Sequence, residues 1–332
     1  MPLIEPTDRG LYCAAGDFYI DPWLPVPRAI ITHGHGDHAY PGCERYLASA
    51  AGEALLRTRL GPEASIESLR YGEGRTIDGV TLSLHPAGHM LGSAQVRVEH
   101  RGEIWVASGD YKLQDDPTCA PFEPLRCDTF ITEATYGMPI YRWRPAEEVY
   151  RQIEEWWETN AASNVTSILY AYALGKAQRL LVGLRALHGP ILAHGTVLKY
   201  LEPYRAAGVR FPEVMHADYD AAKAGRGRAL VLAPPSAAGT PWLRKFMPVS
   251  TAFASGWMTI RGIRRRRNID RGFALSDHAD WDSLLSAIGA TGAQRIGVTH
   301  GYTSVLTRWL QEHGLEAFSL PTRFEGEREE LA

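Results

Sequence analysis

The segment "AIITHGHGDHAY", residues 29–40, decides the fold and the chemistry expected of this chain. Three histidines and one aspartate lie within six positions, directly after an apolar run: His33, His35, Asp37 and His38. On a loop that leaves a strand, His33 and His35 can converge on one ion, while the glycine-rich turn directs Asp37 and His38 toward a second. Imidazole and carboxylate ligands suit zinc, with manganese or iron as substitutes. The alternative is a polar loop that is rich in histidine by chance, and the spacing argues against it.

Further ligand-type residues follow predicted strands elsewhere in the chain. His89 lies in "HPAGHMLGSA", Asp110 in "VASGDYKL" and His300 in "IGVTHGY". Each one alone is equally compatible with an ordinary loop residue, but all three follow a strand and precede a glycine or a turn. We therefore predict two ion sites that share one bridging carboxylate. The first site has His33, His35 and His89, the second has Asp37, His38 and His300, and Asp110 bridges the two.

A pair of divalent ions at this centre predicts hydrolytic chemistry. Two ions about 3.5–4 Å apart share a hydroxide, lower its pKa toward neutrality and hold the oxygens of a phosphoryl group in line with it. Asp37 and Asp110 are therefore expected to be catalytic as well as ligating residues. Attack on a phosphodiester suits such a centre, although a thioester or a lactam is open to the same attack. The ligand residues alone leave the substrate class undecided.

Composition is that of a globular protein in a reducing compartment. The chain has 332 residues, 45% of them hydrophobic and 22% charged, enough for one large domain or two medium ones. We expect a cytoplasmic protein, because no apolar stretch reaches the roughly 20 residues of a membrane span and the N-terminus lacks a signal-peptide pattern. A net charge of -3 restricts nucleic-acid binding to a local basic surface. Four cysteines without a CxxC pair are expected to be small buried or half-buried residues: Cys13, Cys43, Cys119 and Cys127.

The pattern of apolar residues changes along the chain. At first, short β-rich runs such as "VTLSLHPAG" alternate with turn signals, which predicts a sheet-dominated unit. Later, amphipathic segments such as "AEEVYRQIEEWWETN" alternate with buried-strand candidates such as "VTSILYAYA", which predicts a small α/β unit with parallel strands. The ligand-type residues cluster at the two ends of the chain. We therefore expect residues 1–140 and 272–332 to form one domain and residues 141–271 to form an inserted one.

The H-x-H-x-D-H spacing, with the later histidine and aspartate, resembles that of the metallo-β-lactamase superfamily. The resemblance implies an αββα sandwich with its metals at one edge, and it makes Asp21 in "FYIDPW" a structural aspartate near the site. Three stretches resemble motifs A, B and C of the β-CASP nucleases: "TEATYG" with Glu133, "ALSDHADW" with His278 and "VTHGY" with His300. "AYALGKAQRLL" and "FASGWM" resemble segments of the domain inserted in that group. The implied α/β fold is a metallo-β-lactamase sandwich with an inserted, reduced β-CASP-like module.

Within this group the chain is similar to the bacterial ligase-associated DNA exonucleases, which are often labelled mRNA 3′-end processing factors. The insert is compact, and "SGWM" is followed by an arginine run. The resemblance implies a two-metal exonuclease that hydrolyses DNA phosphodiesters at single strands or ends in DNA repair, beside an ATP-dependent ligase and a helicase. However, a histidine at the position of His300 is commoner among RNA-directed members. RNA 3′-end processing or RNA degradation is therefore the alternative function.

The resemblance gives Glu133 and His278 a joint role. It implies that they deliver a proton to the departing oxygen, which suits a carboxylate beside an imidazole. The alternative for His278 is a core or N-cap position before the helix "ADWDSLLSAI", with Ser276 or Asp277 as the cap.

Several residues are expected to contact nucleic acid. Lys176 opens a predicted helix, where backbone amides and an ammonium favour a phosphate, although a solvated surface lysine fits equally well. Trp257 is the candidate for base stacking, and Ser276 is expected nearby. An arginine run, which is more often a solvated loop, is expected to follow the nucleic-acid backbone: Arg264, Arg265, Arg266 and Arg267.

Two further classes of protein compete with a nuclease. A small-molecule hydrolase of the glyoxalase or lactamase type would share the metal residues, but it would not need Glu133, His278 or the "ALGKAQ" segment. A non-catalytic scaffold would have lost ligands, and every expected ligand is present in this sequence.

Overall fold

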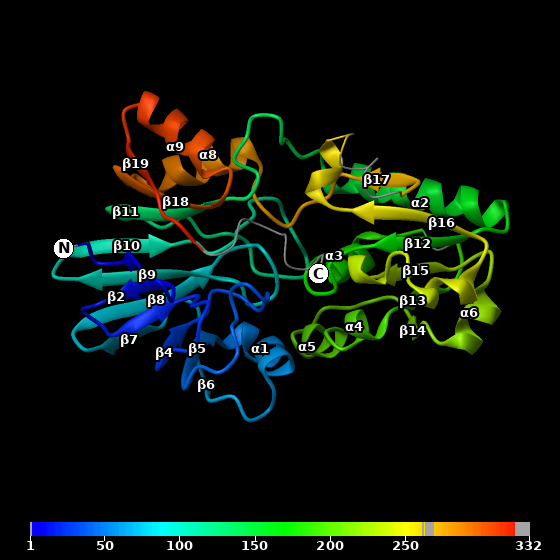
Figure 1. Cartoon of the computed structure of the whole chain (residues 1–332), viewed down its shortest axis with the longest axis horizontal. Helices are drawn as coiled ribbons and strands as arrows, with labels where there is room; N and C mark the ends of the chain where they lie inside the picture. The colour runs from blue at the N-terminus through cyan, green and yellow to red at the C-terminus, as the bar shows by residue number, and fades with distance from the viewer. Residues whose placement is uncertain (1, 187, 261, 263–268, 323–332) are drawn as a thin grey trace. The chain divides into compact units, whose positions relative to one another are not determined.

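The structure, a computed structural model, describes residues 2–186, 188–260, 262 and 269–322, and this part of the chain forms two compact units (Figure 1). The first unit comprises Met1–Arg142 and the described chain from His278 onward, and the second comprises Trp143–Asp277. Each unit has its own sheets and its own hydrophobic clusters. Of the helices described, none is long and apolar enough to cross a membrane.

The first unit begins with a six-stranded mixed sheet. Its strands are β1 (Glu5–Pro6), β2 (Leu11–Cys13), β3 (Phe18–Ile20), β4 (Arg28–Ile30), β5 (Arg45–Ser49) and β6 (Ile66–Leu69). The strand order follows the chain, with antiparallel pairs from β1 to β3 and parallel pairs from β3 to β6. The parallel pairs bring the carboxyl ends of β4 and β5 to the same edge of the sheet.

A seven-stranded sheet forms the rest of this unit's framework. Its strands are β7 (Gly74–Ile77), β8 (Val80–Pro86), β9 (Ala94–His100), β10 (Glu103–Ala107), β11 (Thr129–Ala134), β18 (Arg295–Gly301) and β19 (Glu316–Ser319). The order is β19-β18-β11-β10-β9-β8-β7, antiparallel from β7 to β10 and parallel from β10 to β19. Strand β18 thus lies between β11 and β19, although it comes much later in the chain than β11 (Figure 1).

One apolar layer joins the inner faces of the two sheets. Val80 and Leu82 of β8, which alternate with exposed Thr81, share a buried cluster with Ile30 and Leu47 of the six-stranded sheet. The outer face of each sheet packs in a separate cluster with helices. The helices of this unit are α1 (Glu53–Leu60), on the six-stranded sheet, and α8 (Trp281–Thr291) and α9 (Thr303–Glu312), on the seven-stranded one. The layers are therefore helix, sheet, sheet and helix.

The second unit is built on a parallel sheet. Its strands are β12 (Thr166–Tyr170), β13 (Ile191–Ala193), β14 (Val214–His216), β15 (Leu230–Ala233), β16 (Val249–Ala254) and β17 (Arg271–Phe273). The order is β14-β13-β15-β12-β16-β17, and every described pair is parallel, as the alternating pattern predicted. Strand β17 pairs with β16, and the compact unit extends to Asp277.

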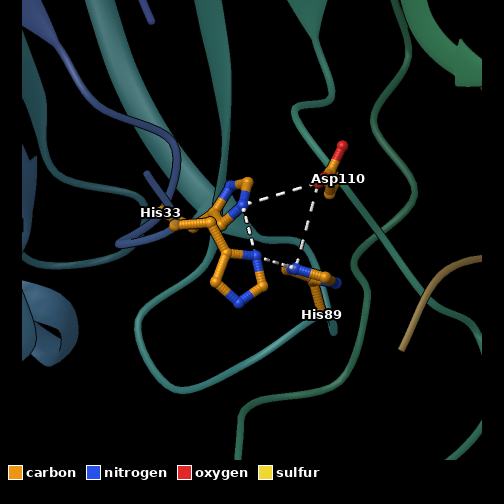
Figure 2. A group of neighbouring side chains, drawn as sticks. His33, His89 and Asp110 are labelled. Carbon is orange, nitrogen blue, oxygen red and sulfur yellow. Dashed lines mark hydrogen bonds and ion pairs between the residues drawn. The ribbon is translucent and has the colours of Figure 1, made fainter. Parts of the chain in front are cut away.

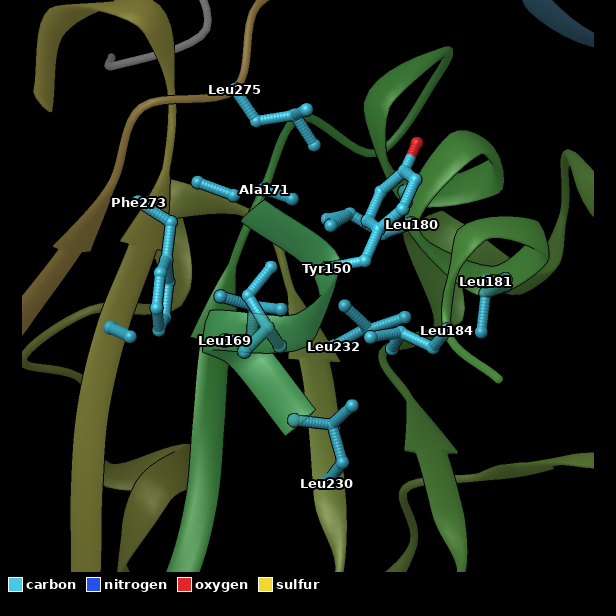
Figure 3. Packing of buried hydrophobic residues seen from close by; sticks show 14 of the residues in the cluster. Tyr150, Leu169, Ala171, Leu180, Leu181, Leu184, Leu230, Leu232, Phe273 and Leu275 are labelled. Atoms are coloured by element: carbon cyan, nitrogen blue, oxygen red, sulfur yellow. The ribbon is translucent and has the colours of Figure 1, made fainter. Parts of the chain in front are cut away.

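Helices cover both faces of this sheet. Leu169, Leu230 and Leu232 of the strands meet Tyr150 of α2 and Leu180 of α3 in one cluster (Figure 3). A second cluster covers the other face. The α-helices are α2 (Ala146–Ala162), α3 (Lys176–Gly183), α4 (Gly195–Leu198), α5 (Leu201–Ala206) and α6 (Tyr219–Gly225). Short 3₁₀ helices are η1 (Ala50–Gly52) in the first unit, and η2 (Pro235–Ala237), η3 (Pro241–Phe246) and η4 (Gly256–Thr259) in the second.

Helix α2 shows how the sequence pattern selects the local structure. Val149, Ile153, Trp156 and Trp157 recur at helical spacing, and all four are buried against the sheet. The indole of Trp157 also donates a hydrogen bond to the carbonyl of Arg228, at 2.7 Å. Both tryptophans therefore belong to the core of the second unit. The cysteines are free and buried or half-buried, also as expected.

Candidate metal centre

The predicted ligands lie at the carboxyl ends of strands in the first unit. The loop from His33 to His38 follows β4, and Asp110 follows β10. Glu133 is near the end of β11, and His300 is near the end of β18. Neighbouring parallel strands end at the same edge of a sheet, so residues that are far apart in the sequence come together here.

Four side chains form a first group of possible metal ligands: His33, His35, His89 and Asp110. One polar atom from each lies within 4.8 Å of the others. The His35 Nδ1 atom is 3.2 Å from both His33 Nε2 and His89 Nε2. The Asp110 Oδ2 atom is 3.5 Å from His33 Nε2, and Figure 2 shows His33, His89 and Asp110 turned toward one another. Three imidazoles and one carboxylate make a donor set that is typical of zinc.

A second group, His38, Asp110 and His300, shares the same aspartate. His38 Nε2 lies 3.4 Å from Asp110 Oδ2 and 3.8 Å from Asp37 Oδ2. His300 Nδ1 lies 3.9 Å from the other carboxylate oxygen of Asp110. Asp110 is thus common to the two groups: its Oδ2 atom lies near His33 and His38, and its Oδ1 atom faces His300.

Glu133 and His278 form a close pair beside these groups. The imidazole Nδ1 of His278 lies 2.9 Å from Glu133 Oε2, and both side chains are buried. The backbone amide of Tyr111 donates to Glu133 Oε1 at 2.8 Å, which fixes the carboxylate. His278 Nδ1 is also 3.9 Å from Asp110 Oδ2. Asp280 caps helix α8 in place of Ser276 or Asp277, so the expected alternative role as a helix cap does not apply to His278 or its two predecessors.

Asp21 connects the loop after β4 to its surroundings. Its Oδ2 atom accepts hydrogen bonds from His38 Nδ1, at 2.7 Å, and from Thr32 Oγ1, at 2.6 Å. Its Oδ1 atom accepts from the Thr32 amide at 2.8 Å. Such a partner fixes both the orientation of the imidazole and the nitrogen that carries the proton, leaving His38 Nε2 directed at Asp110.

Asp21→Asn is expected to weaken ion binding about 10- to 100-fold, because the carboxylate that orients His38 is lost. Isothermal titration of the ion-free protein with zinc measures the effect. Asp17→Asn is the matched control, because Asp17 and Asp21 both have positive φ, 48° and 44°, which asparagine tolerates. Asp17 hydrogen-bonds Tyr12 and none of the predicted ligands. Equal affinities of the Asp21→Asn and Asp17→Asn proteins would contradict this role.

Glycines allow the ligand loops to approach other backbone closely. Gly92, in the loop that carries His89, has a φ of 76°, and a Cβ atom there would lie 2.1 Å from the Cα atom of Gly52. Ser49 bonds the carbonyl of Gly92 at 2.5 Å. Gly301 follows directly after His300, and a Cβ atom there would lie 2.3 Å from the carbonyl oxygen of Ala134. Neither Gly92 nor Gly301 has room for a side chain. Glycine at these two positions therefore allows the chain segments that carry His89 and His300 to pack closely against neighbouring backbone.

The electrostatics of the centre depend on a balance between burial and opposite charge. Burial lowers the pKa of His38, but the carboxylates of Asp110, Asp37 and Asp21 outweigh it and raise the pKa well above its ordinary value. Burial, reinforced by His38, lowers the pKa of His33 and His300. These carboxylates therefore favour a proton on His38, and a bound ion would compete with that proton.

Two buried atoms of the centre fit a bound cation. Within the described part of the chain, His38 Nε2 and Asp110 Oδ1 make no hydrogen bond. Buried polar atoms are seldom left without a partner, since the desolvation is costly. A cavity of about 30 Å³ adjoins both residues and is also lined by Asp37 and His300. The donor types, the two atoms without hydrogen bonds and the cavity all suit ion binding.

The predicted nucleic-acid contacts that the structure describes lie in the second unit. Lys176 opens α3 as expected, but its side chain is fully buried and its Nζ atom lies 3.4 Å from Asp277 Oδ2. This burial does not fit a solvated surface lysine, while the phosphate contact of Lys176 stays a prediction. Ser276 is also buried, and its carbonyl accepts from Arg179. Trp257 is half-buried against an apolar cluster. The arginines Arg264, Arg265, Arg266 and Arg267 lie outside the described residues.

Two residues that hydrogen-bond side chains of the centre were not predicted from the sequence. Thr32 connects Asp21 to the histidine loop through its amide and its hydroxyl, and its position directly before His33 was the available signal. Tyr111 contributes only its backbone amide to Glu133, and a backbone contact of this kind leaves no signal in the residue type.

Comparison with known proteins shows relatives along the whole chain, although no family model matches it. A probable DNA ligase of Opitutus terrae is 33% identical over 325 residues, which cover 96% of this chain and 31% of the relative. Cleavage and polyadenylation specificity factor 73 of Drosophila melanogaster is 30% identical over 173 residues, 48% of this chain and 25% of the relative. Endoribonuclease YSH1 of Yarrowia lipolytica is 27% identical over 142 residues, 33% of this chain and 17% of the relative. The chain thus spans less than a third of the length of these proteins.

A solved structure shares the fold of the chain. The crystal structure of a protein of unknown function from Enterococcus faecalis V583 has a TM-score of 0.60 with this chain at 11% sequence identity. The similarity covers 90% of this chain and 80% of the other.

Proposed function

We propose that this chain is a relative of the β-CASP nucleases of the metallo-β-lactamase superfamily and that it is a metal-dependent exonuclease that hydrolyses DNA. One observation carries the proposal. Two groups of buried or half-buried histidines converge on Asp110, and the Glu133–His278 pair lies directly beside them. A phosphodiesterase needs these two parts, one for attack and one for the departing oxygen.

The proposed ligands are those of the two groups. His33, His35, His89 and Asp110 would hold one ion, and His38, Asp37, His300 and Asp110 the other, with zinc favoured and manganese a substitute. Bound ions would supply a nucleophile derived from water at neutral pH and neutralise charge on the phosphoryl oxygens. The chain's own residues orient the ligands and supply the proton. Asp21 orients His38, and the buried Glu133–His278 pair holds a proton within reach of the leaving alkoxide.

We propose the finer fold and domain assignments on the same basis. The helix, sheet, sheet and helix layers of the first unit support a metallo-β-lactamase αββα sandwich, formed by residues 1–140 and 272–332. The parallel sheet of the second unit supports a reduced β-CASP-like insert at residues 141–271. The compact units, which divide after Arg142 and after Asp277, support this division to within a few residues.

DNA is the favoured substrate, in single strands or at ends, with a place in DNA repair. The relative that matches along nearly the whole chain is named a probable DNA ligase, which supports association with an ATP-dependent ligase. A helicase partner rests on the family resemblance alone. RNA cleavage is the second candidate, favoured by His300 and by the relatives named endoribonucleases. A small-molecule hydrolase is less well supported, because it has no need of the Glu133–His278 pair.

The test is a cleavage assay with matched DNA and RNA oligonucleotides, each labelled at either end, with added zinc or manganese. Stepwise shortening of DNA is expected, and the labelled end gives the polarity. Asp37→Ala is the inactive comparison, and near-UV circular dichroism shows that it is folded. Preferential cutting of RNA would move the protein to RNA processing with its metal centre unchanged. Absence of cutting of either polymer, by protein that carries two ions, would overturn the nuclease function.

A further inference from the structure

We propose that Lys112 is a positioning residue for the metal centre. Its buried ion pair with Asp116 would hold the loop that carries Asp110 against the loop that carries His89. The inference rests on the proposed function, because it assumes that Asp110 and His89 bind an ion together.

The two loops touch through backbone at Lys112. The amide of Lys112 donates to the carbonyl of Ala87 at 3.1 Å. Gly88 has a φ of 75°, and a Cβ atom there would lie 2.2 Å from the Lys112 carbonyl oxygen. Further along the same loop, Cys119 Sγ is 3.4 Å from the Gly88 carbonyl oxygen. The residue before His89 is thus enclosed by the segment that follows Asp110.

The ion pair closes this segment on itself. Lys112 Nζ lies 2.6 Å from Asp116 Oδ2, and the two side chains are only 1% and 3% exposed. The other oxygen of Asp116 accepts from the amide and the hydroxyl of Thr118, at 2.9 and 2.6 Å. Lys112 is therefore connected both to the turn at Asp116 and, through its backbone, to the His89 loop.

A buried ion pair is an inefficient way to stabilise a loop. Desolvation of two charges offsets most of their attraction, and apolar residues of similar size often serve stability as well or better. What the pair provides is a defined geometry, since a short contact between buried charges fixes both side chains. At a metal centre such geometry matters, because ligand distances have to hold to within about 0.2 Å. His89 Nε2 and Asp110 Oδ2 are 4.0 Å apart. Lys112 follows Asp110 by two residues, and its amide bonds the carbonyl of Ala87, two residues before His89.

Lys112→Met tests the inference, because methionine keeps the length of the side chain without its charge. Ion-free protein is titrated calorimetrically with zinc at a temperature at which near-UV circular dichroism shows a folded protein. Binding at one of the two sites is expected to weaken about 10- to 100-fold, as for other residues that orient ligands. Asp116→Asn breaks the same pair from the other side and is expected to have the same effect, which covers the case in which Lys112→Met fails to fold.

Val80→Ala is the matched control for lost stability. Val80 is fully buried at the start of β8, at the hairpin with β7, so its truncation lowers the unfolding temperature without touching either loop. Zinc affinity equal to wild type is expected for this variant. Wild-type affinity in both Lys112→Met and Asp116→Asn would overturn the positioning role, while wild-type protein that binds no ion would overturn the proposed function itself.

Discussion

Asp110→Asn is expected to lower the rate of the proposed phosphodiester cleavage by about 10³-fold or more. Asp110 belongs to both groups of possible ligands, and asparagine keeps its shape but lacks its negative charge. A catalytic ion supplies several kcal/mol of transition-state stabilisation, and about 1.4 kcal/mol corresponds to a factor of ten. Single-turnover cleavage of an end-labelled oligonucleotide measures the rate, and elemental analysis of the dialysed protein measures the ions that remain.

Asp115→Asn is the matched control for this variant. Asp115 is exposed and lies in the same loop, so the same chemical change there is expected to leave the rate and the ion content at wild-type values. An Asp110→Asn protein that cleaves at the wild-type rate with both ions bound would show that Asp110 does not bridge them.

His278→Ala slows cleavage by about 10²- to 10⁴-fold while the ion content stays at the wild-type level. His278 faces Glu133 at 2.9 Å, so its removal takes away the proton that the leaving alkoxide needs. The size of the defect is expected to depend on the leaving group. On a nitrophenyl phosphodiester, whose nitrophenolate departs without a proton, the variant is expected to approach the wild-type rate.

His100→Ala is the comparison for the histidine variant. His100 lies at the end of β9, where it bonds the carbonyl of Gly79, and its loss is expected to change neither rate. Loss of an ion from His278→Ala would make His278 a ligand. An equal defect on both substrates would contradict proton delivery.

Much of the candidate centre could be predicted from the sequence because its strongest signal is local. His33, His35, Asp37 and His38 occupy one loop, so their proximity follows from covalent geometry. His89, Asp110 and His300 could be assigned to the same centre because each was predicted to follow a strand, and the ends of neighbouring strands lie at one edge of a sheet. In the structure His33, His35 and His89 form one group with Asp110, and His38 and His300 form another with it. Asp37 belongs to neither group, although its carboxylate lies 3.8 Å from His38, and its role as a ligand stays a prediction.

The burial of side chains in the second unit could not be predicted from the sequence. The position of Lys176 at a helix start was predicted, but an N-terminal turn that is buried has the same residue pattern as one that is exposed. Its contact with Asp277 depends on which helix packs beside the segment after β17, and no local pattern reports that. Backbone contacts, such as that of Tyr111 with Glu133, are equally hidden from residue types.

The place of β18 between β11 and β19 has a consequence for synthesis. A chain leaves the ribosome at about 5–20 residues per second, and domains fold as they emerge. His300 is the last of the proposed ligands to appear, after the whole second unit has been made. A nascent chain therefore carries the histidine loop, His89 and Asp110 for many seconds without the strand that completes the edge. The complete set of proposed ligands, and with it any hydrolytic activity, can arise only after His300 has been synthesised.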